Sequence, residues 1–325
     1  MKPVLVTGAS GFLGWHVARQ LIERGERVRA LVRPTSRLRE LEGVEAVTGD
    51  LREPDSLERA VAGCGVVYHV AADYRLWAPD SSKMFRSNVD GTRNLLMTAR
   101  SAGVECFVHT STVGCIGVPA GGLGREETPL DPADLVGPYK RSKFLAEQAA
   151  LEFAATGFPV VIVNPTAPIG DHDWKPTPTG KIMVDFLRRC MPAYVDTGLN
   201  LVDAGDVAAG HLLAAGRGRV GERYILGGEN LTLREIFQKM ETVSGIPAAV
   251  VRLPYAVAWA AGVCSTAWAR LTGSAPRVPL DGVRMSRKKM FASSEKAARE
   301  LGYSPRPVEA ALASAVAWFR ANGYC

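Results

Sequence analysis

The stretch "VTGASGFLG", Val6 to Gly14, decides the fold that we expect for this chain. A short apolar run precedes it, and an amphipathic segment follows it. Glycines at three-residue spacing allow a tight turn, a close approach of the backbone to a pyrophosphate, and close packing of helix on strand. A structural glycine turn is the alternative, but the position between a first strand and a first helix predicts a dinucleotide site. The three glycines are Gly8, Gly11 and Gly14.

Apolar runs alternate with helix-period segments through the first half of the chain. Because short buried strands separated by helices form parallel sheets with right-handed crossovers, this alternation predicts an α/β fold with a doubly wound parallel sheet, of the Rossmann type. Ligands of such a sheet bind at the carboxyl ends of the strands. Strands are expected over 3–7, 27–32, 44–50, 66–72, 106–112 and 159–165, and helices over 11–24, 56–62, 88–102 and around Tyr139.

The pattern loosens after Pro165 into the Pro-rich loop "DHDWKPTPTG". We therefore expect a dinucleotide-binding domain with the catalytic helix over 1–165 and a smaller C-terminal substrate lobe over 166–325, some segments of which return to the core. Further helices are expected over 206–215, 295–301 and 308–322, with a strand over 222–228 and a helix opened by a Thr232–Glu235 capping box.

Composition indicates a soluble globular protein with dispersed charge. Hydrophobic residues make up 47% of the 325 residues, and the formal charge is +6. No basic stripe or zinc-finger spacing is apparent, so a nucleic-acid partner is not expected. The six cysteines form no CxxC pair, which favours reduced, mostly buried thiols and no metal site. A strand pattern follows Met1 directly, without signal-peptide features, so we expect a cytoplasmic protein.

The segment Tyr255 to Gly273 is the one candidate for membrane contact. Its apolar stretch ends at Arg270 and is shorter than a bilayer span needs, which favours a buried or half-buried helix. The helical setting favours core positions for Trp259 and Trp268. A helix lying flat on a membrane, with peripheral association, stays open as the alternative.

Residues at the ends of several strands suit contacts with the adenosine part of a dinucleotide. The second strand ends at Arg33, where an NAD site would be expected to show an acid, and a forked guanidinium there suits the 2′-phosphate of NADP. Ser36 and Arg37 follow it, and a solvated loop arginine is the alternative. Asp50 could bond an adenine amine or act as a turn residue or helix N-cap. Small residues at Ala71 and Ala72 let the backbone reach a nucleotide.

The stretch "PYKRSK", Pro138 to Lys143, places a phenol and an ammonium group on one face of a helix. Tyr139 and Lys143 are four residues apart, whereas Lys140 and Arg141 point elsewhere and are expected to be solvated. A neighbouring cation favours the phenolate of a tyrosine. YxxxK pairs also arise by chance.

The stretch "HTST" presents Ser111 and Thr112 at the end of the fifth strand, where a hydroxyl can bond a substrate oxygen. Hydroxyls at strand ends are more often structural. These two come between the dinucleotide half and the YxxxK pair, which favours a catalytic role.

GxxGxxG, "NVDGT" (Asn88 to Thr92), "TST" and YxxxK together resemble the extended short-chain dehydrogenase/reductase superfamily, of the NAD-dependent epimerase/dehydratase type. The later "VDAGDVAAGH" and "ELGYSP" extend the resemblance over almost the whole chain. Within that superfamily, "VRALVRP" and "VNPTAPIG" look closer to dihydroflavonol reductase-like enzymes than to the common UDP-sugar epimerases, and the whole sequence is similar to the hopanoid-associated sugar epimerase group. The resemblance implies Tyr139 as acid/base, Lys143 as its activator and ribose ligand, and Thr112 with Ser111 as carbonyl polarisers. The implied NADP-binding residues are Gly8, Ser10, Gly11, Phe12, Leu13, Gly14, Arg33, Asp50, Leu51, Ala71, Ala72, Tyr139, Lys143 and Pro165.

One departure separates the chain from typical sugar-nucleotide epimerases of this superfamily. Where they read "NVYG", with an asparagine on the sugar diphosphate, this chain reads "APIG", so that Ala167 offers no donor. With the few donors around Trp174, this favours an apolar substrate, although Lys175 and Lys181 leave capacity for an anionic group. The expected activity is that of an NADP-dependent oxidoreductase on a small-molecule carbonyl or secondary alcohol.

Two other functions and the oligomeric state stay open at this point. The first is that of an NDP-sugar epimerase or dehydratase that uses the same residues, Thr112, Tyr139 and Lys143. The second is a non-catalytic NADP-binding sensor, which the presence of Tyr139 disfavours. A homodimer is also open.

Overall fold

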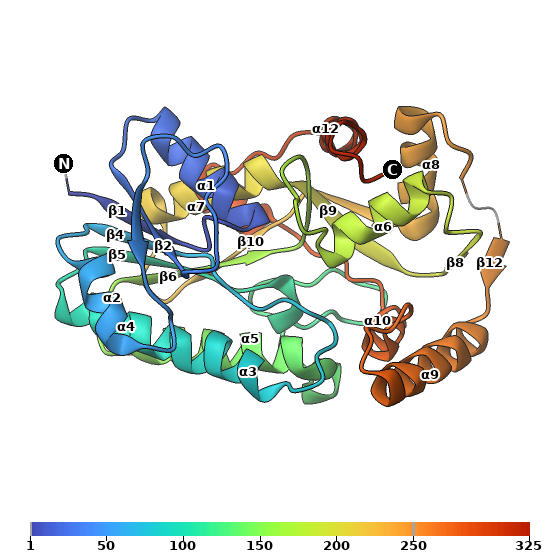
Figure 1. Cartoon of the computed structure of the whole chain (residues 1–325), viewed down its shortest axis with the longest axis horizontal. Coiled ribbons are helices and arrows are strands. Elements are labelled where there is room, and N and C mark those ends of the chain that lie inside the picture. The colour runs from blue at the N-terminus through green and yellow to red at the C-terminus, as the bar shows by residue number, and fades with distance from the viewer. Residues whose placement is uncertain (1, 249–250) are drawn as a thin grey trace.

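A seven-stranded parallel sheet with helices on both faces forms the centre of the computed structural model (Figure 1). The structure describes residues 2–248 and 251–325, so Met1, from which the first strand was expected to follow directly, lies outside the described residues. The predicted doubly wound α/β fold is confirmed. In spatial order the strands are β10 (Arg223–Leu226), β6 (Val160–Pro165), β5 (Cys106–Thr110), β4 (Val66–His69), β1 (Val4–Thr7), β2 (Val28–Val32) and β3 (Glu45–Thr48).

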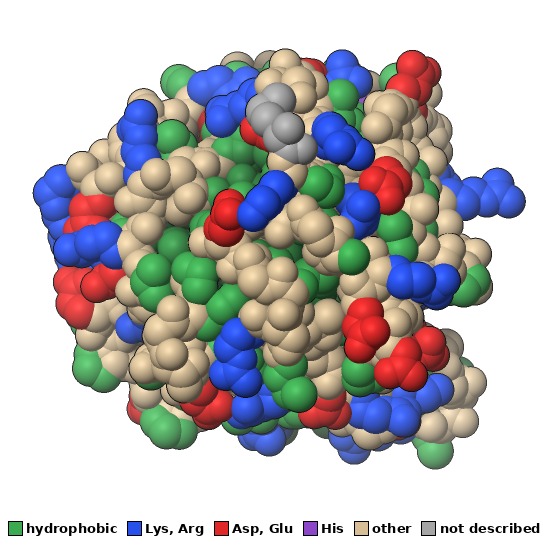
Figure 2. Space-filling view, turned by 90° about the vertical axis from the view of Figure 1, so that its left-hand side faces the viewer, with side chains coloured by type: hydrophobic (Ala, Val, Ile, Leu, Met, Phe, Trp, Pro, Cys, Tyr) green, Lys and Arg blue, Asp and Glu red, His purple; other side chains and the backbone are tan. Residues whose placement is uncertain are grey.

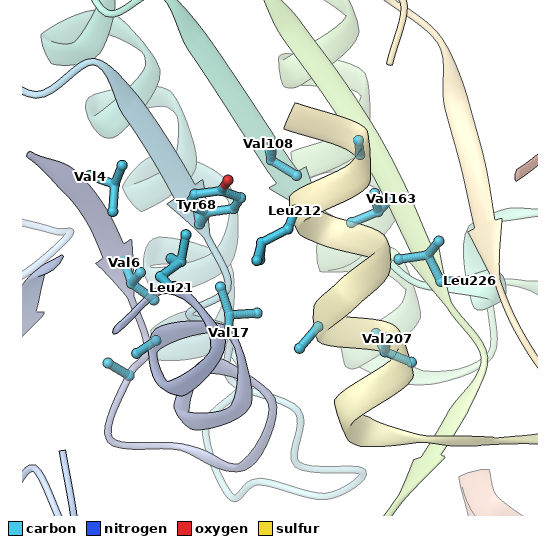
Figure 3. Packing of buried hydrophobic residues seen from close by; sticks show 14 of the residues in the cluster. Val4, Val6, Val17, Leu21, Tyr68, Val108, Val163, Val207, Leu212 and Leu226 are labelled. Atoms are coloured by element: carbon cyan, nitrogen blue, oxygen red, sulfur yellow. The ribbon is translucent and has the colours of Figure 1, made fainter. Parts of the chain in front are cut away.

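Each face of this sheet packs a separate apolar layer. Helices α1 (Phe12–Glu23), α7 (Ala204–Arg217) and α11 (Glu295–Leu301) cover one face, where Val17 and Leu212 lie against Tyr68 and Val108 (Figure 3). Helices α2 (Pro54–Val61), α4 (Gly91–Ser101) and α5 (Gly137–Ala155) cover the other. Because both faces are buried, the strands read as continuous apolar runs. Strands β2 and β3 are added on one side of β1 and strands β4 to β6 on the other, and this change of side puts the ligand crevice at the carboxyl ends of β1 and β4.

The helix expected over 88–102 is longer and irregular at its start. It begins with α3 (Ser82–Phe85), passes through a π-helical turn, η1 (Arg86–Asp90), and continues as α4. The side chain of Asn88, in that turn, donates to the backbone oxygen of Asp73 and to the hydroxyl of Ser142. Single π-helical turns inside α-helices occur frequently at functional sites. The hydrophobic periodicity of the sequence does not predict this one.

The C-terminal half builds a second, smaller apolar centre. It contains a three-stranded sheet, β11 (Glu229–Thr232), β9 (Gly198–Asp203) and β7 (Ala167–Ile169), and a two-stranded one, β12 (Val251–Leu253) and β8 (Ala193–Val195). Helices α6 (Pro178–Leu187), α8 (Leu233–Ser244) and α12 (Val308–Ala321) pack around them. The Thr232–Glu235 capping box that opens α8 is confirmed. Strand β10 returns to the main sheet, and the domain boundary at Pro165 stays a prediction.

Helix α9 (Tyr255–Thr272) corrects the prediction that its tryptophans are core residues. It packs on α10 (Leu280–Met285) through Ala258, Gly262 and Ala269, while Trp259 and Trp268 are exposed. Small side chains face the neighbouring helix because they allow close approach, and the large ones are left outside. Among the described residues, no helix has both the length and the apolar character that crossing a bilayer requires.

The cysteines also differ in part from expectation. Cys64 and Cys115 are buried and Cys106 is half-buried, as predicted for reduced core thiols. The remaining three are exposed, because they lie in the loop after α6, on the outward face of α9 and at position 325, so the prediction of mostly buried thiols is wrong for them. They are Cys190, Cys264 and Cys325.

Candidate active site

The glycine turn after β1 is too crowded for side chains. Gly8 has a φ of 78°, and a Cβ there would lie 2.8 Å from the Cα of Ala71. A Cβ on Gly14 would lie 2.2 Å from the backbone oxygen of Gly8. Helix α1 begins after Gly11 without a side-chain cap, which leaves its first amide groups free of side-chain partners. Such a turn can hold a phosphate group.

A chain of hydrogen bonds behind this turn fixes the end of β4. Thr92 donates to the backbone oxygen of Asn88, so its hydroxyl accepts from Nε2 of His69. Burial lowers the pKa of His69 to about 3, so Nδ1 of the neutral ring accepts from Thr7. Thr7 in turn accepts from the amide of Ala71 at 3.2 Å. The predicted small-residue end of β4 is therefore held against the glycine turn by buried side chains.

Arg33 and Asp50 lie close to each other at the ends of β2 and β3. Arg33 is exposed, and its charge contributes to lowering the pKa of Asp50, although the bidentate bond from Arg52 contributes more. Asp50 therefore acts as a turn residue, one of the roles left open for it. Its neighbour Leu51 accepts from the Asn94 amide and packs against Gly91.

Tyr139 lies in the first turn of α5, and its phenol contacts the Thr112 side chain at the end of β5. Burial raises the pKa of Tyr139 to about 12, and the hydrogen bond with Thr112 offsets only part of that shift. Desolvation sets the direction of this shift, and the role of Lys143 as activator of the phenol stays a prediction. The phenol is protonated at neutral pH.

Lys143 is buried one helical turn further on, and it donates to the backbone oxygen of Thr110 at 2.6 Å. Burial lowers the pKa of its ammonium group to about 8. Arg141 is exposed, as predicted, and donates to Leu135. Lys140 is half-buried, with its ammonium nitrogen 3.9 Å from the Met290 sulfur, so the prediction that it is solvated is wrong.

A network of buried hydrogen bonds, which the sequence did not predict, holds the backbone of Thr112 in place. The Asn164 amide donates to the backbone oxygen of Thr112 at 3.0 Å and to the carboxylate of Glu147 at 2.7 Å. Arg223, from strand β10, pairs with the other oxygen of Glu147. The sequence signal was present, since Glu147 follows Lys143 by four residues and so shares its helix face.

The remaining predicted residues lie at the same edge of the sheet. Ser111 is buried, and its hydroxyl has no hydrogen-bond partner among the described residues. Pro165 ends β6, and Ala167 begins β7 nearby with a buried side chain. On α1, Phe12 is buried, Leu13 is half-buried and Ser10, just before the helix, is exposed. The structure thus brings all the predicted catalytic and cofactor residues to one edge of the sheet.

Trp174 belongs to an aromatic cluster between α1 and α12. Its ring packs edge-on against Trp15 and Trp318, with the Arg39 guanidinium 5.6 Å from the ring centre. It therefore joins α1 to α12, and the apolar substrate inferred in part from the few donors around Trp174 stays a prediction. Two surface pockets, of about 270 and 170 Å³, lie around Arg252, and no predicted site residue lines them.

Three potential metal ligands come together beside this aromatic cluster. They are His16, Asp171 and His172, whose ligand atoms lie within 4.8 Å of one another. His16 contacts the Asp171 backbone oxygen at 3.2 Å, and Glu40 accepts from His172 at 3.1 Å. These protein contacts account for the arrangement.

A dinucleotide turn before α1, a Tyr-Lys pair on α5 and the Thr112 hydroxyl just after β5 are the groups of a Rossmann-type oxidoreductase or epimerase site. The model of the NAD dependent epimerase/dehydratase family matches residues 4–227, so the chain belongs to that family.

Three comparisons cover nearly the full chain. A protein of Synechocystis sp. named putative dihydroflavonol 4-reductase is 48% identical, over 98% of this chain and 95% of its own length. Sterol demethylase protein B of Methylococcus capsulatus is 36% identical, over 98% of both chains. The crystal structure of gox2253 superposes with a TM-score of 0.89, at 46% identity, over 100% of this chain and 99% of the other.

Proposed function

We propose that this chain is an NADP-dependent reductase that transfers a hydride between nicotinamide and a carbonyl or secondary alcohol carbon. The observation that carries the proposal is the phenol of the half-buried Tyr139, which contacts Thr112 just after β5 and is protonated at neutral pH, because desolvation raises its pKa to about 12. A protonated phenol is the form that donates to the oxygen of a carbonyl during reduction.

The cofactor fits the glycine turn, because Gly8 and Gly14 leave no room for a Cβ and α1 presents uncapped amides. When bound, NADP supplies or accepts the hydride. Arg33 would contact the 2′-phosphate, and Lys143 would donate to a ribose hydroxyl. The others proposed to surround the cofactor are Ser10, Gly11, Phe12, Leu13, Asp50, Leu51, Ala71, Ala72, Tyr139 and Pro165.

The proton path uses this chain's own residues. Thr112 donates to the substrate oxygen and fixes its position, with Ser111 beside it, while Tyr139 Oη gives its proton to that oxygen as the hydride reaches carbon. In the oxidative direction Tyr139 takes the proton back. Asn164 holds the backbone of Thr112, which makes it a positioning residue.

The proposed substrate is a fairly apolar carbonyl compound. Ala167 supplies no donor for a diphosphate, and relatives named for dihydroflavonol reduction and sterol demethylation act, by those names, on ring compounds. The free cysteines support a cytoplasmic location. The rival is an NDP-sugar epimerase or dehydratase, which the family description favours. An NADP-binding sensor is disfavoured because Tyr139 and Lys143 are both present.

The test compares UDP-glucose and UDP-galactose with a panel of hydrophobic ketones and aldehydes under NADPH. Product stereochemistry and net NADPH oxidation are both followed, with Tyr139→Phe as the inactive control. NADPH consumption with apolar carbonyls alone supports the reductase. Epimerised sugar without net NADPH consumption overturns it and establishes the epimerase.

A further inference from the structure

The outward face of helix α9 is apolar along its whole length. Its exposed positions recur at intervals of three and four residues, so they share one side of the helix. Trp268 is 67% exposed and Leu271 is 83% exposed, and the single charge of the helix, Arg270, lies at the edge of this side. A contiguous exposed apolar patch on a protein surface marks an interaction site. The residues of this apolar face are Ala256, Val257, Ala260, Ala261, Cys264, Ala267, Trp268 and Leu271.

The net charge of the protein is concentrated around this helix, which corrects the expectation of dispersed charge. Residues 251–291 contain seven lysines and arginines and one aspartate, a net charge of +6. The whole chain has 39 basic and 33 acidic residues, so the remainder has 32 of each and is neutral. Figure 2, which views the left-hand side of Figure 1 and not the α9 side, shows cations and acids interspersed.

Acids from neighbouring elements neutralise part of this charge. Asp196 pairs with Arg252 and lies 4.0 Å from Lys289, and Asp134 pairs with Lys288. Asp281 pairs with Arg284. Among the described residues, no acid lies within ion-pair distance of the other three cations, which are Arg270, Arg277 and Arg287.

We propose that the apolar face of α9 docks on an anionic lipid bilayer surface. Tryptophan and leucine side chains enter the interface between headgroups and acyl chains, and the surrounding cations attract the acidic headgroups. The opposite side of α9 is covered by α10, where a Cβ on Gly262 would lie 3.1 Å from Val283. The side of α9 that faces α10 is thus shielded by protein, whereas in an isolated amphipathic helix the side turned away from lipid is polar and faces water. Only the exposed apolar face of α9 enters the lipid.

The test measures co-flotation of the full chain with phosphatidylcholine vesicles, with and without phosphatidylglycerol, at low and high salt. We expect binding to the anionic vesicles, weakened by salt. The double variant Trp268→Glu/Leu271→Glu should lower the bound fraction at least about tenfold, since both anchors become anions. The matched control, Met97→Glu/Val220→Glu, makes the same charge change at exposed apolar positions on other elements.

A second measurement does not depend on the double variant. Brominated phosphatidylcholine, mixed with phosphatidylglycerol, should quench the tryptophan fluorescence of the unaltered chain, and Trp268→Phe should remove most of that quenching. Retained NADPH binding and circular dichroism check that each variant is folded. The proposal is overturned if anionic vesicles bind no protein, or if the control variant loses as much binding. It is also overturned if α9 only forms a contact with a second copy, seen as a dimer that Trp268→Glu/Leu271→Glu dissociates. Neither measurement requires enzymatic activity.

Discussion

The ammonium nitrogen of Lys143 lies 2.6 Å from the backbone oxygen of Thr110, two residues before Thr112. This bond ties helix α5 to the end of β5, and so fixes the phenol of Tyr139 relative to the hydroxyl that it contacts. The Lys143 side chain is buried, and desolvation of the ammonium group lowers its pKa to about 8. A buried cation with a single backbone partner has donors left for a ligand.

Replacing Lys143 should therefore impair both binding and turnover. Lys143→Met removes the proposed ribose donor, and we expect NADPH affinity to fall by about tenfold, the effect of one charge-assisted hydrogen bond. Turnover should fall by at least about a hundredfold. Calorimetric titration and steady-state kinetics measure the two effects. Lys140→Met, on the same helix, is the control that should keep NADPH affinity, and unchanged affinity in Lys143→Met would disprove the ribose contact.

Tyr139→Phe should separate chemistry from binding. The phenol is proposed to give its proton to the substrate oxygen, so its loss should lower kcat by about a hundredfold to ten-thousandfold while NADPH affinity changes little. Tyr303→Phe makes the same chemical change at a buried phenol without a hydrogen-bond partner among the described residues, and should keep full activity. Substantial turnover by the Tyr139 variant would assign the proton transfer to another group.

The stability of the fold should depend on pH through Asp173. Its carboxylate accepts from the amide and hydroxyl of Thr177, and burial raises its pKa to about 6. Between about pH 4 and 6 the folded chain thus holds a proton that the unfolded chain has released, so the free energy of unfolding falls as pH rises through this window. A shift of about two pKa units corresponds to at most about 3 kcal/mol.

Urea unfolding of the wild type and Asp173→Asn across that window measures the effect. Burial also raises the pKa of Glu126, so the difference between the two proteins, rather than either curve, isolates Asp173. The wild type should lose stability relative to the variant as pH rises from about 4 to 6. Parallel curves would mean that Asp173 keeps its ordinary pKa in the fold.

Local patterns predicted the framework of the molecule because its strands and first helices follow simple periods. The glycine turn, the alternation of strands and helices in the first half, and the capping box at Thr232 all depend on neighbours in the sequence, and all are found. Contacts between distant segments were not predictable in this way. The bond from Asn164 to Thr112 spans 52 residues, and the pairing of Glu147 with Arg223 spans 76.

Exposure on α9 was missed for a related reason. An all-apolar helix is indistinguishable in sequence from a buried one, and only its packing shows which side is covered. Here α10 covers the small residues Ala258 and Gly262 and leaves Trp268 outside. The raised pKa of the Tyr139 phenol could not be predicted for a similar reason, because desolvation depends on the surrounding fold and not on the spacing to Lys143.

The last prediction concerns cofactor choice, which rests on Arg33. Its guanidinium is exposed at the end of β2, is not ion-paired with any described acid, and lies near Asp50. A charge-assisted bond to a 2′-phosphate is worth about 1.5 to 3 kcal/mol, so NADPH should bind about tenfold to a hundredfold more tightly than NADH. Arg33→Ala should remove that preference by weakening NADPH alone, while NADH affinity stays the same. Arg37→Ala, four residues on in the same exposed loop, controls for the general loss of positive charge and should reduce NADPH affinity less. Fluorescence titration of both cofactors against the three proteins measures these ratios at low salt, where surface charge acts most strongly. Equal affinities for NADH and NADPH in the wild type would contradict the assignment of Arg33 to the 2′-phosphate.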